Sequence, residues 1–176
     1  ATSGFLPYKT IKVGGNASSL PNRNKFTNCY YGVYARDEAI DVTNNDFDDC
    51  YNGVYLNQAK VDALLNGTVN CTMKGNNFVR LKRTGFTLNK NETINAEISS
   101  NNINNSTSPA FLYSRAIDIV EANAPTSALY KINGVNRFTM VWQGIRTMLT
   151  YGTIIENNRI ILHTNTTPNV FTVNNA

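Results

Sequence analysis

The sequence predicts an all-β solenoid, one domain over residues 1–176, in which short parallel strands wind into stacked coils. Three observations predict this fold: a sequence unit recurs along the chain, apolar and polar residues alternate within the unit, and 28 of the 176 residues are asparagine. Asparagine disfavours helices and ordinary strands but tolerates tight turns and left-handed backbone. Because Val, Ile, Phe and Tyr also recur regularly, we expect many similar turns rather than disorder.

The recurring unit has the form N-x-[F/I]-x-x-[small or apolar], and its copies start near residues 24, 45, 76, 101, 136 and 158. The aromatic or Ile positions are separated by 21, 31, 25, 35 and 22 residues, and they are Phe26, Phe47, Phe78, Ile103, Phe138 and Ile160. A period of about 20 to 35 residues with variable insertions indicates a solenoid.

Each unit holds signals for two further strands. Alternating segments follow the aromatic position at 32–35 (GVYA), 53–56 (GVYL), 85–88 (GFTL) and 144–147 (GIRT). Short apolar pairs precede the asparagine, at Ile40 and Val42, Cys71 and Met73, Ala96 and Ile98, and Thr153 and Ile155, whereas residues 131–133 depart from this spacing. Three strands per coil place equal positions one above another, about 4.8 Å apart. We therefore expect ladders of Phe and Ile inside the coil, a second interior ladder of Val33, Val54, Phe86 and Ile145, and stacked asparagines at a corner.

The units, written as N-x-F-x-x-C-x-x-G-[IV]-x-[LA], resemble the right-handed parallel β-helix family with pectate-lyase-like repeats, over about residues 24–173. The Asn-rich sequence of these units, for example NCYYGVY, is similar to that of repeat proteins on the surface of Bacteroidota-type bacteria. The resemblance implies a right-handed β-helix of about six to seven coils. It also implies an extracellular or cell-surface location and a segment of a longer chain. Further coils or a partner protein are expected at the open coil ends.

The coils differ in length, and the extra residues predict loops on one side of the solenoid. Residues 57–68, 89–93 and 120–130 exceed the shortest coil. Loops stacked on one face either build a binding site or merely cover the coils.

Composition narrows the classes of function. The net charge of +4 is too diffuse to predict a nucleic-acid partner, and no apolar run is long enough to span a membrane. Cys29, Cys50 and Cys71 form no Cys-x-x-Cys motif, and His163 is the single histidine, so no metal site is predicted and the cysteines are expected to be small buried residues.

An enzymatic interpretation depends on five charged residues. Asp46, Asp48 and Asp49 lie one coil before Arg80 and Lys82. They resemble the carboxylates and base of a calcium-dependent polysaccharide lyase, the one interpretation that would require calcium. The same residues are equally typical of an exposed ladder of ion pairs. A glycoside hydrolase is not indicated, because His163 lacks the glycine that follows such a histidine and no Arg-Ile-Lys motif is present.

The binding interpretation depends on aromatic residues four and eight positions after the ladder residue. Alternation from Cys29 and Val33 directs these side chains outward, and they are Tyr30, Tyr51 and Trp142 in one column and Tyr34 and Tyr55 in another. Lys82 is expected in the first column, and Phe111 and Arg146 in the second. Outward aromatic rings suit stacking on sugars, although tyrosines also pack on each other without a ligand.

We therefore predict a non-catalytic scaffold or adhesin module that binds polysaccharide along its Tyr and Trp face. The alternatives are a carbohydrate-active enzyme, lyase or hydrolase, and a trimeric tailspike-like fibre. A β-helix fold is compatible with all three, because fold does not determine function.

Overall fold

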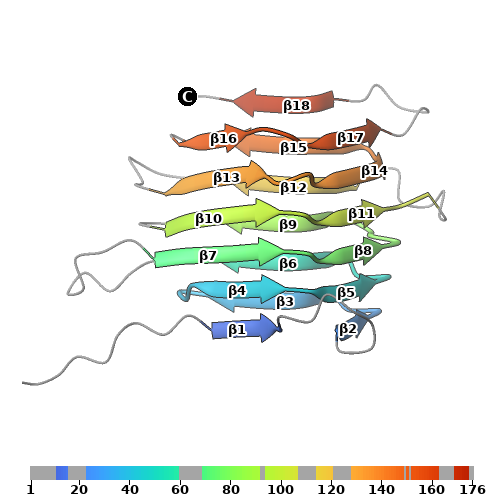
Figure 1. The fold of residues 1–176 in the computed structure, drawn as a ribbon, viewed down its shortest axis with the longest axis horizontal. Coiled ribbons are helices and arrows are strands. Elements are labelled where there is room, and N and C mark those ends of the chain that lie inside the picture. The colour runs from blue at the N-terminus through green and yellow to red at the C-terminus, as the bar shows by residue number, and fades with distance from the viewer. Residues whose placement is uncertain are drawn as a thin grey trace, which may run out of the picture.

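The computed structural model describes residues 11–15, 23–59, 69–91, 94–106, 114–120, 128–148, 150, 152–162 and 169–174. Within these residues the chain contains no helix and forms three parallel six-stranded sheets. Successive strands enter sheets A, B and C in turn, so each group of three strands is one coil and six coils stack along one axis (Figure 1). The predicted all-β solenoid and its coil number are confirmed.

The strands of the three sheets are short. Sheet A contains β1 (Ile11–Gly14), β4 (Ile40–Thr43), β7 (Val69–Lys74), β10 (Ile94–Ser99), β13 (Leu129–Asn133) and β16 (Thr153–Ile155). Sheet B contains β2 (Asn24–Thr27), β5 (Asn45–Asp48), β8 (Asn77–Val79), β11 (Asn102–Asn104), β14 (Arg137–Val141) and β17 (Arg159–Leu162). Sheet C contains β3 (Tyr31–Arg36), β6 (Asn52–Asn57), β9 (Thr84–Asn89), β12 (Arg115–Val120), β15 (Gln143–Met148) and β18 (Asn169–Asn174).

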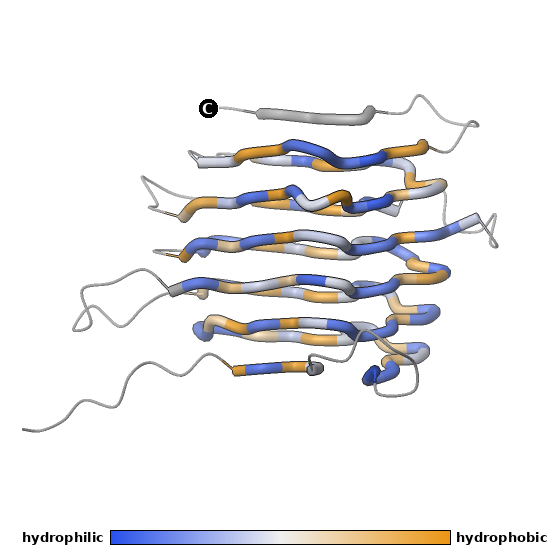
Figure 2. Tube along the Cα trace, viewed as in Figure 1, coloured by the Kyte–Doolittle hydropathy of each residue, from blue (hydrophilic) through white to orange (hydrophobic). Residues whose placement is uncertain are grey.

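The interior is built from ladders of equal positions. The predicted ladder in sheet B is continuous in the strand register, from Phe26 through Phe47, Phe78, Ile103 and Phe138 to Ile160. Its phenylalanine rings stack with centroids 4.9 Å apart for Phe26 and Phe47 and 4.6 Å apart for Phe47 and Phe78. Figure 2 shows hydrophilic and hydrophobic residues alternating along the strands, as expected when one side faces this core.

The glycine of the repeated Gly-Val-Tyr motif makes room for this ladder. A Cβ atom at Gly32 would lie 2.4 Å from a ring carbon of Phe47, and one at Gly53 would lie 2.2 Å from a ring carbon of Phe78. At Gly85 the Cβ would lie 2.6 Å from Ile103 Cδ1. The motif therefore recurs because each coil must leave space for the large side chain of the coil stacked on it.

The corner between sheets A and B carries the predicted asparagine stack. The side-chain amide of each residue donates to the side-chain oxygen of the next, with nitrogen–oxygen distances of 2.8–3.1 Å, along Asn24, Asn45, Asn76, Asn101, Asn136 and Asn158. The amides of Asn76 and Asn101 also donate to the strand carbonyls of Val42 and Met73, at 2.8 Å each. These buried amides satisfy turn backbone that water cannot reach.

Two details of the predicted register differ in the structure. The positions of Ala96 and Ile98 are continued by Tyr130 and Ile132, because Gly134 and Val135, both with positive φ, lengthen the following turn by one residue. The second interior ladder includes Ile117 between Phe86 and Ile145, a member that the sequence comparison missed.

The predicted insertions 57–68, 89–93 and 120–130 all connect a strand of sheet C to the next strand of sheet A. Most of their residues, at 60–68, 92–93 and 121–127, lie outside the described part of the chain, as does His163.

Candidate functional site

The predicted tyrosines lie together on the outer surface of sheet C. In β3 and β6, Val33 and Val54 point into the core, and the next residues, Tyr34 and Tyr55, face outward in register with each other. Tyr30 and Tyr51 precede the same strands and stack with ring centroids 4.8 Å apart and planes 14° apart. Alternation along the strand and stacking of the coils thus bring four of the five predicted ligand-binding residues into one group.

A fifth tyrosine, Tyr31, completes the group. Its ring centroid lies 4.7 Å from that of Tyr30, 5.2 Å from that of Tyr34 and 5.3 Å from that of Tyr55. The sequence comparison missed Tyr31 because its position is Asn52, Thr84 and Arg115 in the next coils, which share no aromatic character. We call Tyr30, Tyr31, Tyr34, Tyr51 and Tyr55 the tyrosine cluster.

The tyrosine cluster keeps much of its ring surface in contact with solvent. Tyr30 is 59% exposed and Tyr34 is 49% exposed, although each ring already contacts other rings of the cluster. Desolvation raises the pKa of the Tyr31 hydroxyl above its usual 10.0, and the neighbouring Tyr30, Tyr55 and Tyr34 raise it further, while Arg83 lowers it. The Tyr31 hydroxyl is thus available as a neutral hydrogen-bond donor near neutral pH.

Lys82 lies in the predicted column, because its amide donates to the Cys50 carbonyl as the amide of Tyr51 donates to the Cys29 carbonyl. The turn before β9 has one residue more than the turn before β6, and this additional residue is Arg83, whose amide donates to the carbonyl of Tyr51. The Arg83 guanidinium carbon lies 5.8 Å from the centre of the Tyr51 ring, which is within the range of a cation–π interaction. The tyrosine cluster therefore ends at a cation.

Trp142 is in the predicted column but does not contact the tyrosine cluster. Its coil is three coils beyond that of Tyr51, a separation of about 14 Å at the usual strand spacing. The guanidinium carbon of Arg115 lies 5.6 Å from the centre of the Trp142 ring, and Arg115 Nε donates to Gln143 Oε1 at 2.8 Å. Trp142 and Arg115 thus form a second, separate aromatic and cationic patch on sheet C.

The second column changes from aromatic to charged along the axis. Tyr34 and Tyr55 are followed by Thr87, Asp118 and Arg146, so Asp118 stands where Phe111, outside the described residues, was expected. Arg146 donates to both carboxylate oxygens of Asp118 at 2.7 Å. Burial lowers the pKa of the Arg115 guanidinium, and the nearby Arg146 and Arg83 lower it further.

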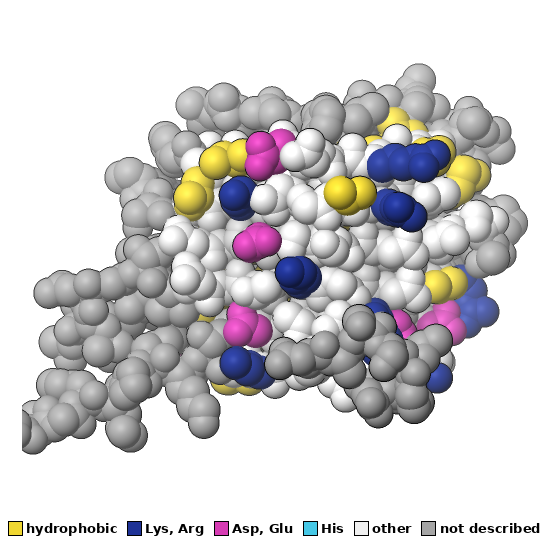
Figure 3. Space-filling view, in the orientation of Figure 1, with side chains coloured by type: hydrophobic (Ala, Val, Ile, Leu, Met, Phe, Trp, Pro, Cys, Tyr) yellow, Lys and Arg dark blue, Asp and Glu magenta, His cyan; other side chains and the backbone are white. Residues whose placement is uncertain are grey.

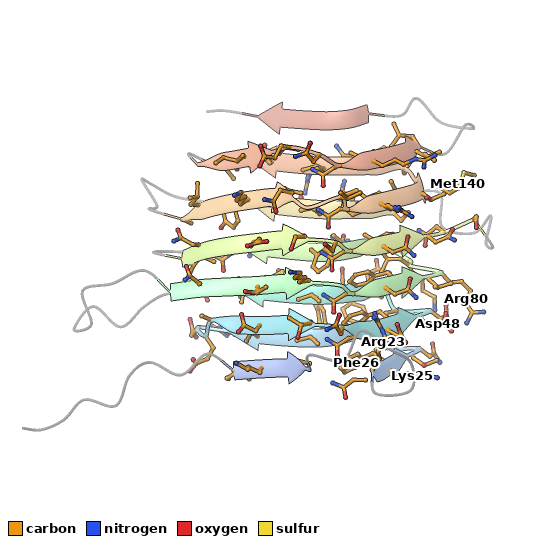
Figure 4. All side chains as sticks on the ribbon, viewed as in Figure 1. Arg23, Lys25, Phe26, Asp48, Arg80 and Met140 are labelled. Carbon is orange, nitrogen blue, oxygen red and sulfur yellow. The ribbon has the colours of Figure 1, made fainter. Side chains whose placement is uncertain are left out.

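The five residues of the enzymatic interpretation form separate ion pairs. Arg80 pairs with Asp48 at 2.5 Å, Lys82 pairs with Asp49 at 2.9 Å, and Asp46 pairs with Arg23 at 2.7 Å. Asp49 and Arg80 occupy equivalent turn positions with positive φ on adjacent coils, but each pairs with another residue, Lys82 and Asp48 respectively. In Figure 4 the side chains of Asp48 and Arg80 lie together at the ends of β5 and β8 and point away from the coil.

Other chemistry is sparse in the described residues. Among them, no group of three or more His, Cys, Asp or Glu side chains is arranged to hold a metal ion. Burial raises the pKa of the Cys71 thiol to about 11 and also raises that of Cys50, so both are unreactive thiols at neutral pH. No helix in this part of the chain has the length and apolarity needed to cross a membrane.

Comparison with known proteins gives the fold family. Residues 7–129 match the family described as a right handed beta helix region. No curated protein and no solved structure matches the chain. The description of the matching family names a fold and no activity. The similarities to pectate-lyase-like repeats and to Bacteroidota surface proteins therefore stay predictions.

Proposed function

We propose that this chain, which belongs to the right-handed β-helix family, is a non-catalytic module that binds polysaccharide on the outer face of sheet C. The module would serve as a scaffold or adhesin in a secreted or cell-surface protein. The observation that carries the proposal is the tyrosine cluster, five solvent-reaching rings on two adjacent coils, bounded by Arg83.

The chemistry of the tyrosine cluster suits a sugar polymer. Aromatic rings offer large apolar faces for the C–H faces of sugars, and their hydroxyls supply hydrogen bonds at the rim. The cluster is rigid because each ring is held by its neighbours, so little side-chain freedom is lost on binding. A chain that continued along the axis would reach Arg115 and Trp142 about 14 Å further on.

The enzymatic alternative has less support. Asp46, Asp48 and Asp49 each have a cation as partner, and the pairs of Asp48 and Asp49 reach solvent, as is typical of surface ion pairs rather than of a site prepared for calcium. The open edges of the end coils would be covered by further coils, by a partner protein or by copies in a trimeric fibre.

Titration with a panel of neutral and acidic polysaccharides tests the proposal, with Trp142 and tyrosine fluorescence and calorimetry as readouts. Tyr51→Ala should weaken binding about tenfold, equivalent to about 1.4 kcal/mol, whereas Tyr51→Phe should bind nearly as the parent does. Ile154→Ala, at an exposed position on sheet A, is the matched control. Trp142→Ala should weaken binding only of oligosaccharides long enough to reach both patches.

Three results would contradict the proposal. Equal affinity of the parent and Tyr51→Ala would mean that the tyrosines serve coil packing alone. Release of shortened sugars over hours, dependent on calcium, would establish the lyase instead. Absence of binding by every polysaccharide would leave a scaffold whose partners are proteins.

A further inference from the structure

A pair of arginines on sheet B lacks the carboxylate or aromatic partner that each of the other described arginines has. Arg137 begins β14 and Arg159 begins β17, and the two residues are directly opposite each other in the strand register. The residues that follow them, Phe138 and Ile160, belong to the core ladder, so alternation places both arginines on the outer face, where both are exposed.

Like charges in register on neighbouring strands repel each other. Sheet A shows the opposite arrangement, since Lys12 faces Asp41 and Glu97 faces Lys131 in its register. Figure 3 shows acidic and basic side chains mixed over sheet A, whereas over β14 and β17 the basic side chains gather without an acidic neighbour.

Each of the other six arginines has a partner for its guanidinium. Five of them pair with a carboxylate within 4.0 Å, and they are Arg23, Arg36, Arg80, Arg115 and Arg146. The sixth, Arg83, lies over the ring of Tyr51. Within the described part of the chain, Arg137 and Arg159 form no ion pair, no side-chain hydrogen bond and no ring contact.

No acidic residue in the described part of the chain is positioned to neutralise the pair. The column that contains it continues with Asn102 and Asn77, whose side chains hydrogen-bond to each other at 2.7 Å. The chain segments 107–113 and 163–168 contain no Asp or Glu. Glu156, three residues before Arg159, is exposed and does not reach either guanidinium within ion-pair distance.

We propose that Arg137 and Arg159 form a binding site for a tetrahedral oxyanion, phosphate or sulfate, held between the two guanidinium groups. Two planar guanidiniums present parallel N–H donors that match the oxygens of such an anion, and a dianion neutralises both charges. The site is on sheet B, separate from the tyrosine cluster on sheet C, and does not depend on the proposed function. The anion is either a free ion or a phosphate ester carried by a sugar.

The direction in which the unfolding temperature changes when one arginine is removed distinguishes an anion-binding site from a charge pair without a ligand. Because the arginines repel each other without an anion, Arg159→Gln should unfold at a higher temperature than the parent in dilute chloride buffer. Millimolar phosphate should then raise the unfolding temperature of the parent, because binding to the native state alone stabilises it, and should not raise that of Arg159→Gln. Low concentrations exclude the general stabilisation that concentrated sulfate or phosphate gives to any protein.

The experiment is a titration with inorganic phosphate, with inorganic sulfate and with glucose 6-phosphate, at ionic strength matched with sodium chloride. Thermal unfolding and the NMR signals of the arginine Nε–H groups are recorded for the parent, Arg137→Lys, Arg159→Gln and the control Arg36→Gln. We expect phosphate to shift only two arginine Nε–H signals of the parent. The affinity for phosphate should fall at least about fivefold in Arg137→Lys, because lysine lacks the paired N–H donors of the guanidinium, and should be unchanged in Arg36→Gln.

Tighter binding of glucose 6-phosphate than of phosphate would identify an ester as the ligand, and weaker binding would identify the free ion. Equal affinities of the parent and Arg159→Gln, or no phosphate-specific shift in the parent, would overturn the site. If Arg137→Lys bound phosphate as tightly as the parent does, and chloride displaced the phosphate, the binding would be general electrostatic attraction and not a specific site.

Discussion

Replacing Asn76 with alanine is expected to destabilise the fold by about 2 to 6 kcal/mol, because it breaks the buried asparagine stack at its centre. Asn76 is 1% exposed. Its Oδ1 accepts from the backbone N–H and the side-chain amide of Asn45, both at 3.1 Å. Its Nδ2 donates to the Val42 carbonyl at 2.8 Å and to Asn101 Oδ1 at 3.1 Å.

The size of the destabilisation depends on which buried groups keep another hydrogen-bond partner when the Asn76 side chain is removed. In the alanine variant Asn101 Oδ1 still accepts from the Asn76 backbone N–H, and the Asn45 amide still donates to the Val13 and Thr43 carbonyls. The Asn45 backbone N–H and the Val42 carbonyl lose the bonds that Asn76 made. An unsatisfied buried group costs about 1 to 3 kcal/mol, which sets the expected range.

Asn76→Asp adds a second signature, a dependence on pH. The aspartate has nearly the same shape, but one oxygen replaces the donor and faces the Val42 carbonyl and Asn101 Oδ1. Burial, and the two acceptor oxygens that face this position, raise the folded-state pKa of the carboxyl above the unfolded value of about 3.9. The variant is therefore relatively more stable below that value and loses this stability as pH rises through the folded-state pKa. We expect Asn76→Asp to be less stable than Asn76→Ala at pH 7 and to recover at about pH 4.

Urea unfolding followed by tyrosine fluorescence and circular dichroism measures these differences. The control is Asn77→Ala, at the next residue, where the side chain faces outward and Asn102 donates to it. That variant should lose less than about 1 kcal/mol because water replaces the lost bond. Equal stability of the Asn76 and Asn77 variants, or an Asn76→Asp variant that does not respond to pH, would refute the reasoning about the stack.

Two further predictions concern the core. Gly53→Ala should lower the free energy of unfolding by about 3 kcal/mol, since its Cβ would lie 2.2 Å from a ring carbon of Phe78 and 2.7 Å from the Gly85 carbonyl. Adding Phe78→Leu to this variant should restore part of the lost stability. The control Gly15→Ala, whose Cβ would have no atom within 4 Å, should be neutral in the same urea experiment. Burial raises the pKa of the Cys71 thiol from its usual 9.0 to about 11, so the unfolded chain releases this proton first and Cys71 contributes stability below pH 9 that is lost as pH rises to 11. The loss of stability should be about 2 to 3 kcal/mol. Urea unfolding at about pH 8 and pH 11 should show this loss in the parent and a smaller loss in Cys71→Ala. Equal pH dependence of the two proteins would contradict the role assigned to Cys71.

The interior could be predicted from the sequence because every coil imposes the same requirement on the next one. Phe47 and Phe78 recur because each ring stacks on the previous ring, and Gly53 recurs because the ring needs its space. Outward direction could be predicted for Tyr34 by alternation from Val33. These inferences use a residue and its immediate neighbours, which the sequence shows directly.

The lengths of the turns could not be predicted in the same way. One additional residue before β9, Arg83, brings a guanidinium over the Tyr51 ring, and the longer segment before β12 moves Asp118 into the column where Phe111 was expected. A turn that gains a residue keeps the strands on both sides unchanged, so the apolar pattern carries no record of the change. Functional positions next to turns, such as Tyr31 and Arg83, are therefore the ones that the sequence comparison missed.

The outer column of sheet C shows that stacking of the coils does not itself require tyrosine. Tyr34, Tyr55, Thr87, Asp118 and Arg146 occupy one register position in five successive coils, and the strands pair equally at each of them. At Thr87 a small polar side chain is sufficient, and at Asp118 and Arg146 an ion pair replaces any ring contact. Since the fold accepts all of these, the gathering of five tyrosines on two coils is not a consequence of the β-helix. Exposed rings add a hydrophobic surface that a solenoid has no structural reason to concentrate in one place. The tyrosine cluster is thus better explained by a ligand that lies across it than by the stability of the coils that carry it.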